Sequence, residues 1–151
     1  AGSLVNAAAT VAAVLRRSPD VVSIVAMGAE ASVRSDEDEQ CALYMRNLLQ
    51  GCQPDRDAVR SLVLAGAESQ KYGDPERPHF HLEDREMALQ IDSISFAVRV
   101  SREDGLLVAR PEPVARGVPR GAALGSNRER RQGPGYSRTA PKPDRALAAR
   151  G

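Results

Sequence analysis

Aromatic residues and cysteines are scarce in this chain of 151 residues. It contains no Trp, two Phe and three Tyr, so aliphatic side chains must supply almost all of any core, a composition that suits strands covered by helices. Its two cysteines, Cys41 and Cys52, have no second pair to form a zinc knuckle or a disulfide framework. We therefore expect free thiols and a cytoplasmic protein.

Long hydrophobic runs are also missing from the sequence. No apolar run approaches the roughly 20 residues that a membrane-spanning helix requires. No charged segment followed by a hydrophobic stretch indicates a secretion signal. The sequence therefore predicts no membrane partner, and its length suits a single domain with one core.

The small net charge of +1 hides a marked asymmetry. From Gly117 onward there are eight Lys or Arg residues and two acidic residues, a net charge of +6, which leaves −5 for residues 1–116. Residues 117–151 also hold six Gly and four Pro. Their only sizeable apolar side chains are those of Val118, Leu124, Tyr136 and Leu147. Because so few apolar groups cannot offset the entropy of ordering, we predict a folded part, 1–116, followed by a disordered basic tail, 117–151.

Local capping and breaking signals predict four helices in the folded part. The expected helices are about ten residues after the cap Asn6, residues 36–50 after the cap Ser35, residues 57–70 opened by Asp57, and residues 82–90. Helical spacing assigns apolar side chains to their buried faces. These are Val11, Val14 and Leu15, then Cys41, Leu43, Tyr44, Leu48 and Leu49, and finally Val59, Leu62 and Val63.

Two segments have the composition of strands. Val21–Met27 is a nearly continuous β-rich apolar run, which is typical of a strand buried on both faces. Residues 95–100 and 106–109 flank Asp104-Gly105 and predict a hairpin. The fold class expected is α/β, a layered sheet with flanking helices. Since a strand covered on both faces needs parallel neighbours that we do not find in this sequence, the domain is expected to be incomplete.

An acidic cluster, Asp36 to Glu39, opens the second predicted helix, with Glu30 nearby. Mg²⁺ is held by one or two carboxylates together with water and substrate phosphate, so the cluster is a candidate metal site. Acidic residues in a first helical turn also stabilise the helix without any ligand. Both interpretations stay open on composition.

Small and hydrogen-bonding residues, Gly2 to Ala7, stand just before the first predicted helix. Free amides at a helix start favour an anion, although ordinary capping by Asn6 accounts for the same residues.

His79 and His81 lack a third zinc ligand at an obvious spacing. Cys41 lies in the apolar stripe of its helix, where a structural thiol is expected rather than a nucleophile.

Several of these stretches, taken in order, resemble the C-terminal part of the 2-phosphosulfolactate phosphatase family, the ComB-like proteins. The similar segments are Gly2-Ser3-Leu4-Val5-Asn6-Ala7, Val21–Met27 with Gly28 and Glu30, Ser35-Asp36-Glu37-Asp38 running to Cys41-Ala42, Asp92–Val100, and Arg102-Glu103-Asp104-Gly105. The similarity covers roughly residues 1–113 and is weaker between Gln53 and Glu83.

The resemblance implies an α/β protein that uses Mg²⁺ to hydrolyse 2-phosphosulfolactate, or a related 2-hydroxy-acid phosphate, on the way to coenzyme M. Glu37 and Asp38 match the family's Glu-Asp pair and are expected to serve the metal or its waters. Ser3 and Asn6 match its loop motif and are expected to bind the substrate anion. The family's N-terminal half has no counterpart in this sequence, so we expect a truncated phosphatase whose activity depends on that half.

A second hypothesis belongs to a different class of function. The chain would be a non-catalytic remnant that acts in association, with the basic tail binding an anionic partner. An incomplete sheet leaves open edges that invite pairing between chains, so a homo-oligomer is compatible with either hypothesis. Nucleic acid is not the expected partner, because the basic residues of the tail are dispersed and Tyr136 is its only aromatic residue for stacking.

Overall fold

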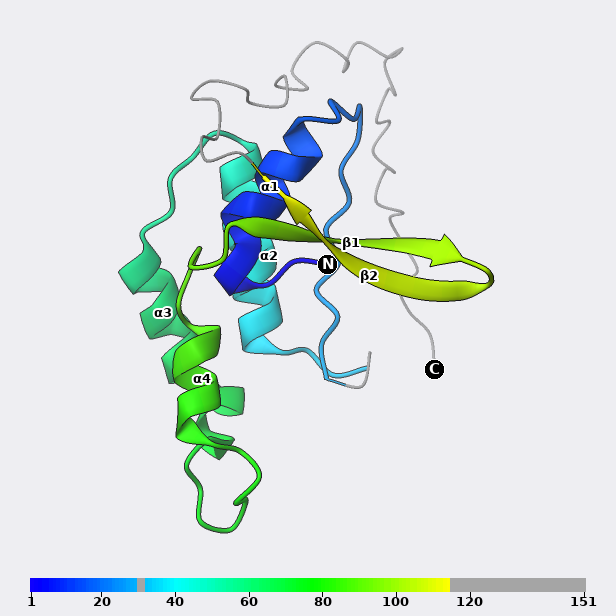
Figure 1. Cartoon of the computed structure of the whole chain (residues 1–151). Coiled ribbons are helices and arrows are strands. Elements are labelled where there is room, and N and C mark those ends of the chain that lie inside the picture. The colour runs from blue at the N-terminus through cyan, green and yellow to red at the C-terminus, as the bar shows by residue number, and fades with distance from the viewer. Residues whose placement is uncertain (30–31, 115–151) are drawn as a thin grey trace, which may run out of the picture.

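A computed structural model describes residues 1–29 and 32–114 of the chain. They form a mixed α/β arrangement of four α-helices, two short 3₁₀ helices and one antiparallel pair of strands (Figure 1). In chain order these are η1 (Leu4–Asn6), α1 (Ala7–Leu15), α2 (Asp36–Leu49), α3 (Arg56–Ala65), η2 (Ala67–Lys71), α4 (Leu82–Ala88), β1 (Phe96–Glu103) and β2 (Leu106–Pro113). The predicted α/β composition is confirmed, and the predicted tail lies outside the described residues.

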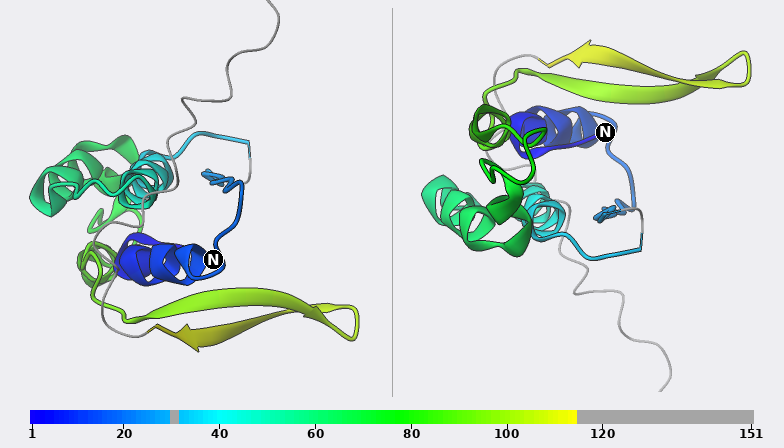
Figure 2. Two further views of the ribbon diagram at one scale, coloured as in Figure 1. Left: turned by 90° about the horizontal axis from the view of Figure 1, so that it is seen from above. Right: turned by 90° about the horizontal axis from the view of Figure 1, so that it is seen from below.

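The alanine-rich helix α1 lies at the centre of the molecule. The β1–β2 hairpin covers one side of it, and α2 and α3 lie on the opposite side (Figure 2). Its small side chains let both layers approach closely, and Ala7 and Val11 are almost completely buried. On β1, Ala97 is the buried residue of the facing layer. The first predicted helix is therefore confirmed, and it is the central layer of the described fold.

The hydrophobic core lies where α2, α3 and α4 meet the start of the chain. Its buried members are Leu4, Ala7, Tyr44, Val59, Val63 and Leu89. Cys41 and Leu48 are half-buried beside them, as expected for the inner face of α2. Leu43 and Leu62 were expected to be buried but are 47% and 55% exposed, because each points away from the faces that α2 and α3 turn toward this cluster.

The helix ends depart from the prediction in α3 and α4, and Asn6 and Ser35 stand at the N-cap positions of α1 and α2 without a side-chain capping bond. The cap of α3 is Asp55 and not Asp57, since the Asp55 carboxylate accepts hydrogen bonds from the amides of Asp57 and Ala58 at 2.9 and 3.1 Å. Gly66, in an extended conformation, then ends α3 and leads into η2, so the third helix stops at Ala65 and does not continue to residue 70. Helix α4 ends at Ala88, two residues before the predicted end.

The hairpin is formed as predicted from the sequence. Phe96 pairs with Pro113 and Glu103 with Leu106, and Asp104-Gly105 makes the turn with positive φ angles of 49° and 83°. Positive φ at both central residues is the geometry of the turn that matches the twist of paired strands. Gly105 meets this requirement without steric cost.

Val21–Met27 was predicted to be a strand buried on both faces, and this prediction is wrong for the described structure. The segment is extended, but the sheet of the described part contains only β1 and β2. Val21, Val25 and Met27 are 79%, 74% and 65% exposed. A strand is defined by ladder hydrogen bonds to a neighbour, and within residues 1–29 and 32–114 this segment has none; the isolated bridge between Ala29 and Val33 lies beyond its end.

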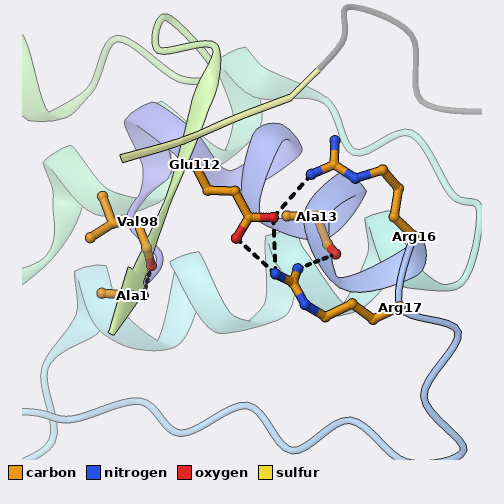
Figure 3. A network of polar contacts seen from close by, with 6 residues as sticks. All are labelled: Ala1, Ala13, Arg16, Arg17, Val98 and Glu112. Carbon is orange, nitrogen blue, oxygen red and sulfur yellow. Dashed lines mark hydrogen bonds and ion pairs between the residues drawn. The ribbon is translucent and has the colours of Figure 1, made fainter. Parts of the chain in front are cut away.

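Ion pairs join the end of α1 to the hairpin. Figure 3 shows Glu112 of β2 between Arg16 and Arg17, which follow α1, with N···O distances of 3.1 and 2.8 Å. Arg17 also donates to the carbonyl of Ala13 at 2.8 Å. These contacts fasten the end of α1 to the last strand.

Candidate functional site

A cavity of about 160 Å³ opens where the start of the chain, the N-terminal turn of α2, η2 and α4 converge. Its polar or ionisable lining residues are Ser3, Glu37, Asp38, Cys41, Glu68, Ser69, Tyr72 and Arg85. Its apolar lining comes from Ala88 and from Leu4, Val63 and Leu89, which belong to the core. The cavity is thus held by the hydrophobic core on one side and carries polar groups on the other.

Three of the four residues expected at the site lie in this one cavity. Ser3 comes from the turn before α1, and Glu37 and Asp38 come from the first turn of α2. Asn6 does not line the cavity. It is buried, and its Oδ1 accepts hydrogen bonds from the amide and hydroxyl of Ser3 at 2.8 and 3.2 Å. Asn6 therefore fixes the turn that presents Ser3.

The four acids at the start of α2 have different surroundings. Glu37 Oε1 accepts from the Ser35 hydroxyl at 2.6 Å, and Asp38 Oδ2 accepts from the Gly28 amide at 2.7 Å. Asp36 accepts from the Ala67 amide, and Glu39 pairs with Arg34. Of the four, Glu37 and Asp38 line the cavity. Glu37 and Asp38 thus differ from Asp36 and Glu39 in facing the cavity.

The carboxylates of the cavity are of the kind that bind a hard cation which takes only one or two ligands from the protein. Within the described ranges, no three His, Cys, Asp or Glu side chains converge as a ready metal cage. Mg²⁺ does not need one, because it keeps several waters and takes one or two carboxylates plus a substrate phosphate. Glu37 and Asp38 meet that requirement, since each has one carboxylate oxygen with no hydrogen bond to described protein groups.

Cys41 faces the same cavity from the next turn of α2. Burial, with smaller contributions from the negative charges of Asp38 and Asp92, raises the pKa of this thiol to about 11. The thiol is therefore protonated near neutral pH and is a poor nucleophile. This agrees with the structural role expected from its place in the apolar stripe.

The positive side of the cavity has no clear signal in the sequence. Arg85 of α4 stands among acidic neighbours in the sequence, and only folding brings it to Glu37 and Asp38. Its Nη1 donates to the Ser69 carbonyl at 3.2 Å, and its Nε is buried with no hydrogen-bond partner in the described part of the chain. Sequence reasoning missed this half-buried arginine, whose Nε is buried without a partner among the described residues.

Charge in the cavity is unbalanced toward the negative. Three carboxylates, those of Glu37, Asp38 and Glu68, share the lining with the one guanidinium of Arg85. Glu68 is partly neutralised by Lys71 at 2.5 Å, and its hydrogen bond raises the pKa of that lysine. The remaining excess, on Glu37 and Asp38, favours a bound cation.

His79 and His81 lie in the exposed loop before α4 and outside the cavity lining, His79 with its ring centroid 4.3 Å from that of Phe80. No helix in the described ranges combines the length and apolar character needed to cross a bilayer.

Comparison of the chain with protein-family models, with curated proteins and with solved structures finds no match.

Proposed function

We propose that the chain belongs to a Mg²⁺-dependent phosphatase that hydrolyses 2-phosphosulfolactate or a related 2-hydroxy-acid phosphate. One observation carries the proposal: Ser3, Glu37 and Asp38, which the family resemblance selects from separate parts of the sequence, line a single cavity together with Arg85. The finer expectation of a truncated, incomplete layered domain belongs to the same proposal. Its support is the exposure of the strand-like segment that contains Val21, Val25 and Met27.

Glu37 and Asp38 are the residues that would hold Mg²⁺ or its waters. When bound, the cation neutralises the charge that develops on a transferring phosphoryl group. The acidic lining by itself repels a phosphate dianion, so substrate binding in this cavity should require the cation. Ser3 lines the cavity, and its hydroxyl, which donates to Asn6 Oδ1 at 3.2 Å, would exchange that bond for one to a substrate oxygen.

The size of the cavity favours a small substrate. Its volume of about 160 Å³ is well below the roughly 300–1,000 Å³ of sites that take drug-sized ligands. A phosphorylated three-carbon acid suits such a volume better than a nucleotide does. The neutral thiol of Cys41 and the side chains of Leu4 and Leu89 form the apolar part of its lining.

The test is phosphate release by the full product of the gene that encodes this chain. We expect release from 2-phosphosulfolactate or 2-phospholactate with Mg²⁺, none with EDTA, and a loss of at least about a hundredfold in the Glu37→Gln, Asp38→Asn double variant. The matched control is Glu83→Gln, Asp84→Asn, an exposed Glu-Asp pair in the first turn of α4. Equal activity in both double variants would leave Glu37 and Asp38 with a capping role alone.

A second candidate is a non-catalytic role in association. Its support is apolar surface that the described part leaves open, including Leu106 and Leu107 near the hairpin turn at about 70% exposure. Under this alternative the chain binds another copy of itself or a partner through that surface, and the basic tail binds an anion. Analytical ultracentrifugation at several protein concentrations, together with hydrophobic dye binding, separates the two. A dye-negative monomer with phosphatase activity would eliminate the second candidate.

A further inference from the structure

We propose that Val21–Met27 forms the interface of a symmetric dimer, in which it pairs antiparallel with the same segment of a second copy of this chain. The inference goes beyond the proposed function, because it rests on the backbone of this segment and not on the cavity. It also differs from association through Leu106 and Leu107, since it names another surface, one partner and one register.

The backbone of Val21–Met27 is open to pairing with another strand. The segment is extended (Figure 1), and none of its N–H or C=O groups bonds to another backbone group of the described chain. At its end the Gly28 amide donates to Asp38 at 2.7 Å, which ties the segment to the start of α2. Extended backbone without ladder partners is the template to which a further strand adds.

The side chains of the segment suit pairing with a copy of itself. Those of Val21, Val25 and Met27 are exposed, and no residue from Val21 to Ala29 is charged. Exposed segments that are rich in β-branched residues, uncharged and free of proline are the ones that pair with each other. The net charge of the chain is only +1, so long-range repulsion between two copies is weak. The composition therefore favours a second copy as the occupant of this edge.

An antiparallel register centred on Ile24 matches the segment to itself. It places Ile24 opposite its own counterpart, Ser23 opposite Val25, and Val21 opposite Met27. All these opposed side chains are uncharged, and valine and isoleucine pack well across a pair of strands. Both copies contribute the same residues, so the contact is isologous and gives a closed dimer.

Charge and proline at the ends of the segment disfavour the neighbouring registers. Moving the centre one residue toward the C-terminus would place Asp20 opposite Glu30, and like charges directly opposite each other destabilise a pair of strands. Moving it one residue toward the N-terminus would bring Pro19, which has no N–H, opposite Met27. The register centred on Ile24 avoids both problems.

Sedimentation-velocity ultracentrifugation of the whole chain over a range of concentrations measures the pairing. Ser23 and Val25 are exposed, so substitutions there should leave the monomer folded. We expect a dimer in the unmodified chain. The Ser23→Lys, Val25→Lys double variant opposes like charges twice and should raise the dissociation constant at least about tenfold. The Ser23→Lys, Val25→Glu double variant opposes unlike charges at the same positions and should restore the dimer.

The control is Leu107→Lys, which changes a 69% exposed apolar residue of the hairpin and should dimerise like the unmodified chain. A chain that stays monomeric at every concentration overturns the proposal and leaves the segment to another occupant, such as a strand of the full gene product. A dimer that is lost in Leu107→Lys and kept in Ser23→Lys, Val25→Lys overturns it in favour of the hairpin surface. Equal loss of the dimer in both double variants refutes the register centred on Ile24.

Discussion

Asp92 joins three segments of the fold, and its replacement by Asn should be strongly destabilising. One carboxylate oxygen accepts from the Ala8 amide at 2.7 Å, at the positive start of α1. The other accepts from the Tyr44 hydroxyl at 2.6 Å and from Arg56 at 2.9 Å. The side chain is only 6% exposed, so water cannot replace partners that are lost.

The magnitude follows from what an asparagine at this position could still do. Its amide oxygen could keep the bond to Ala8, but its NH₂ group would then face the donors of Tyr44 and Arg56. Arg56 is 60% exposed, so its share is below about 1 kcal/mol. Disruption of the buried, charge-assisted bonds brings the expected loss of unfolding free energy to about 2 kcal/mol. In a domain of about 100 residues this lowers Tm by roughly 8 °C.

Urea unfolding followed by circular dichroism at 222 nm measures the loss. Asp104→Asn is the matched control, because Asp104 also has a positive φ, 49° against 57° for Asp92, and lies at the hairpin turn. Asn tolerates that conformation, so backbone strain is the same in both variants. A midpoint change in Asp92→Asn no larger than that in Asp104→Asn would refute the view that Asp92 joins these segments.

Three further predictions concern pH, the loop before α2, and the two thiols. Burial first, and then the hydrogen bond to Asp92, raises the pKa of Tyr44 above its usual value near 10. The protonated Tyr44 therefore contributes its full share of stability below pH 10, and this share is lost as pH rises through the folded-state pKa. Urea unfolding at pH 9 to 11.5 should show this loss, and the Tyr44→Phe variant should lack it. Gly28→Ala should destabilise the chain by about 2 kcal/mol or more and abolish Mg²⁺-dependent phosphate release. The reason is that Gly28 has a φ of +70° and an added Cβ would lie 2.2 Å from the Val33 carbonyl oxygen. An unfolding free energy and an activity equal to those of the unmodified chain would contradict this prediction. Ellman's reagent at pH 7.5 should modify the exposed Cys52 at least about tenfold faster than Cys41, whose thiol is half-buried with a pKa of about 11; equal rates in the folded chain would show that Cys41 is accessible.

Elements with a local cause could be predicted from the sequence. The acidic first turn after Ser35 and the Asp104-Gly105 turn depend on neighbouring residues, and α2 and the hairpin formed where expected. The cap of α3 was misassigned because Asp55 and Asp57 both satisfy the capping rule, and only the extended backbone of Asp55 decides between them. Val21–Met27 has the composition of a strand, but pairing depends on a distant neighbour, which local composition does not reveal.

In the candidate site, too, the residues in short motifs could be predicted, and those that depend on distant packing could not. Glu37, Asp38 and Ser3 could be proposed from short motifs, and the fold brings them to one cavity. Asn6 was expected either to cap α1 or to bind an anion. It stands at the N-cap position of α1 without a side-chain capping bond, and its Oδ1 instead accepts from Ser3 and closes the turn of η1. Arg85 could not be proposed, since nothing in its own segment distinguishes it from other surface arginines. Its buried Nε is a property of packing between α4 and η2.

The fastening of α1 to β2 has a consequence for the order of folding. Arg17 and Glu112 are 95 positions apart, so closing the loop between them costs about 4 kcal/mol of chain entropy before any contact is gained. At roughly 5–20 residues per second, the ribosome completes β2 about 5 to 20 s after α1. During that interval the alanine face of α1 that the hairpin later covers is open to water and to other chains. Of the described helices, α1 is made before the others yet is fully enclosed only when β2 is complete, so folding should be sensitive to any truncation that removes the final strand.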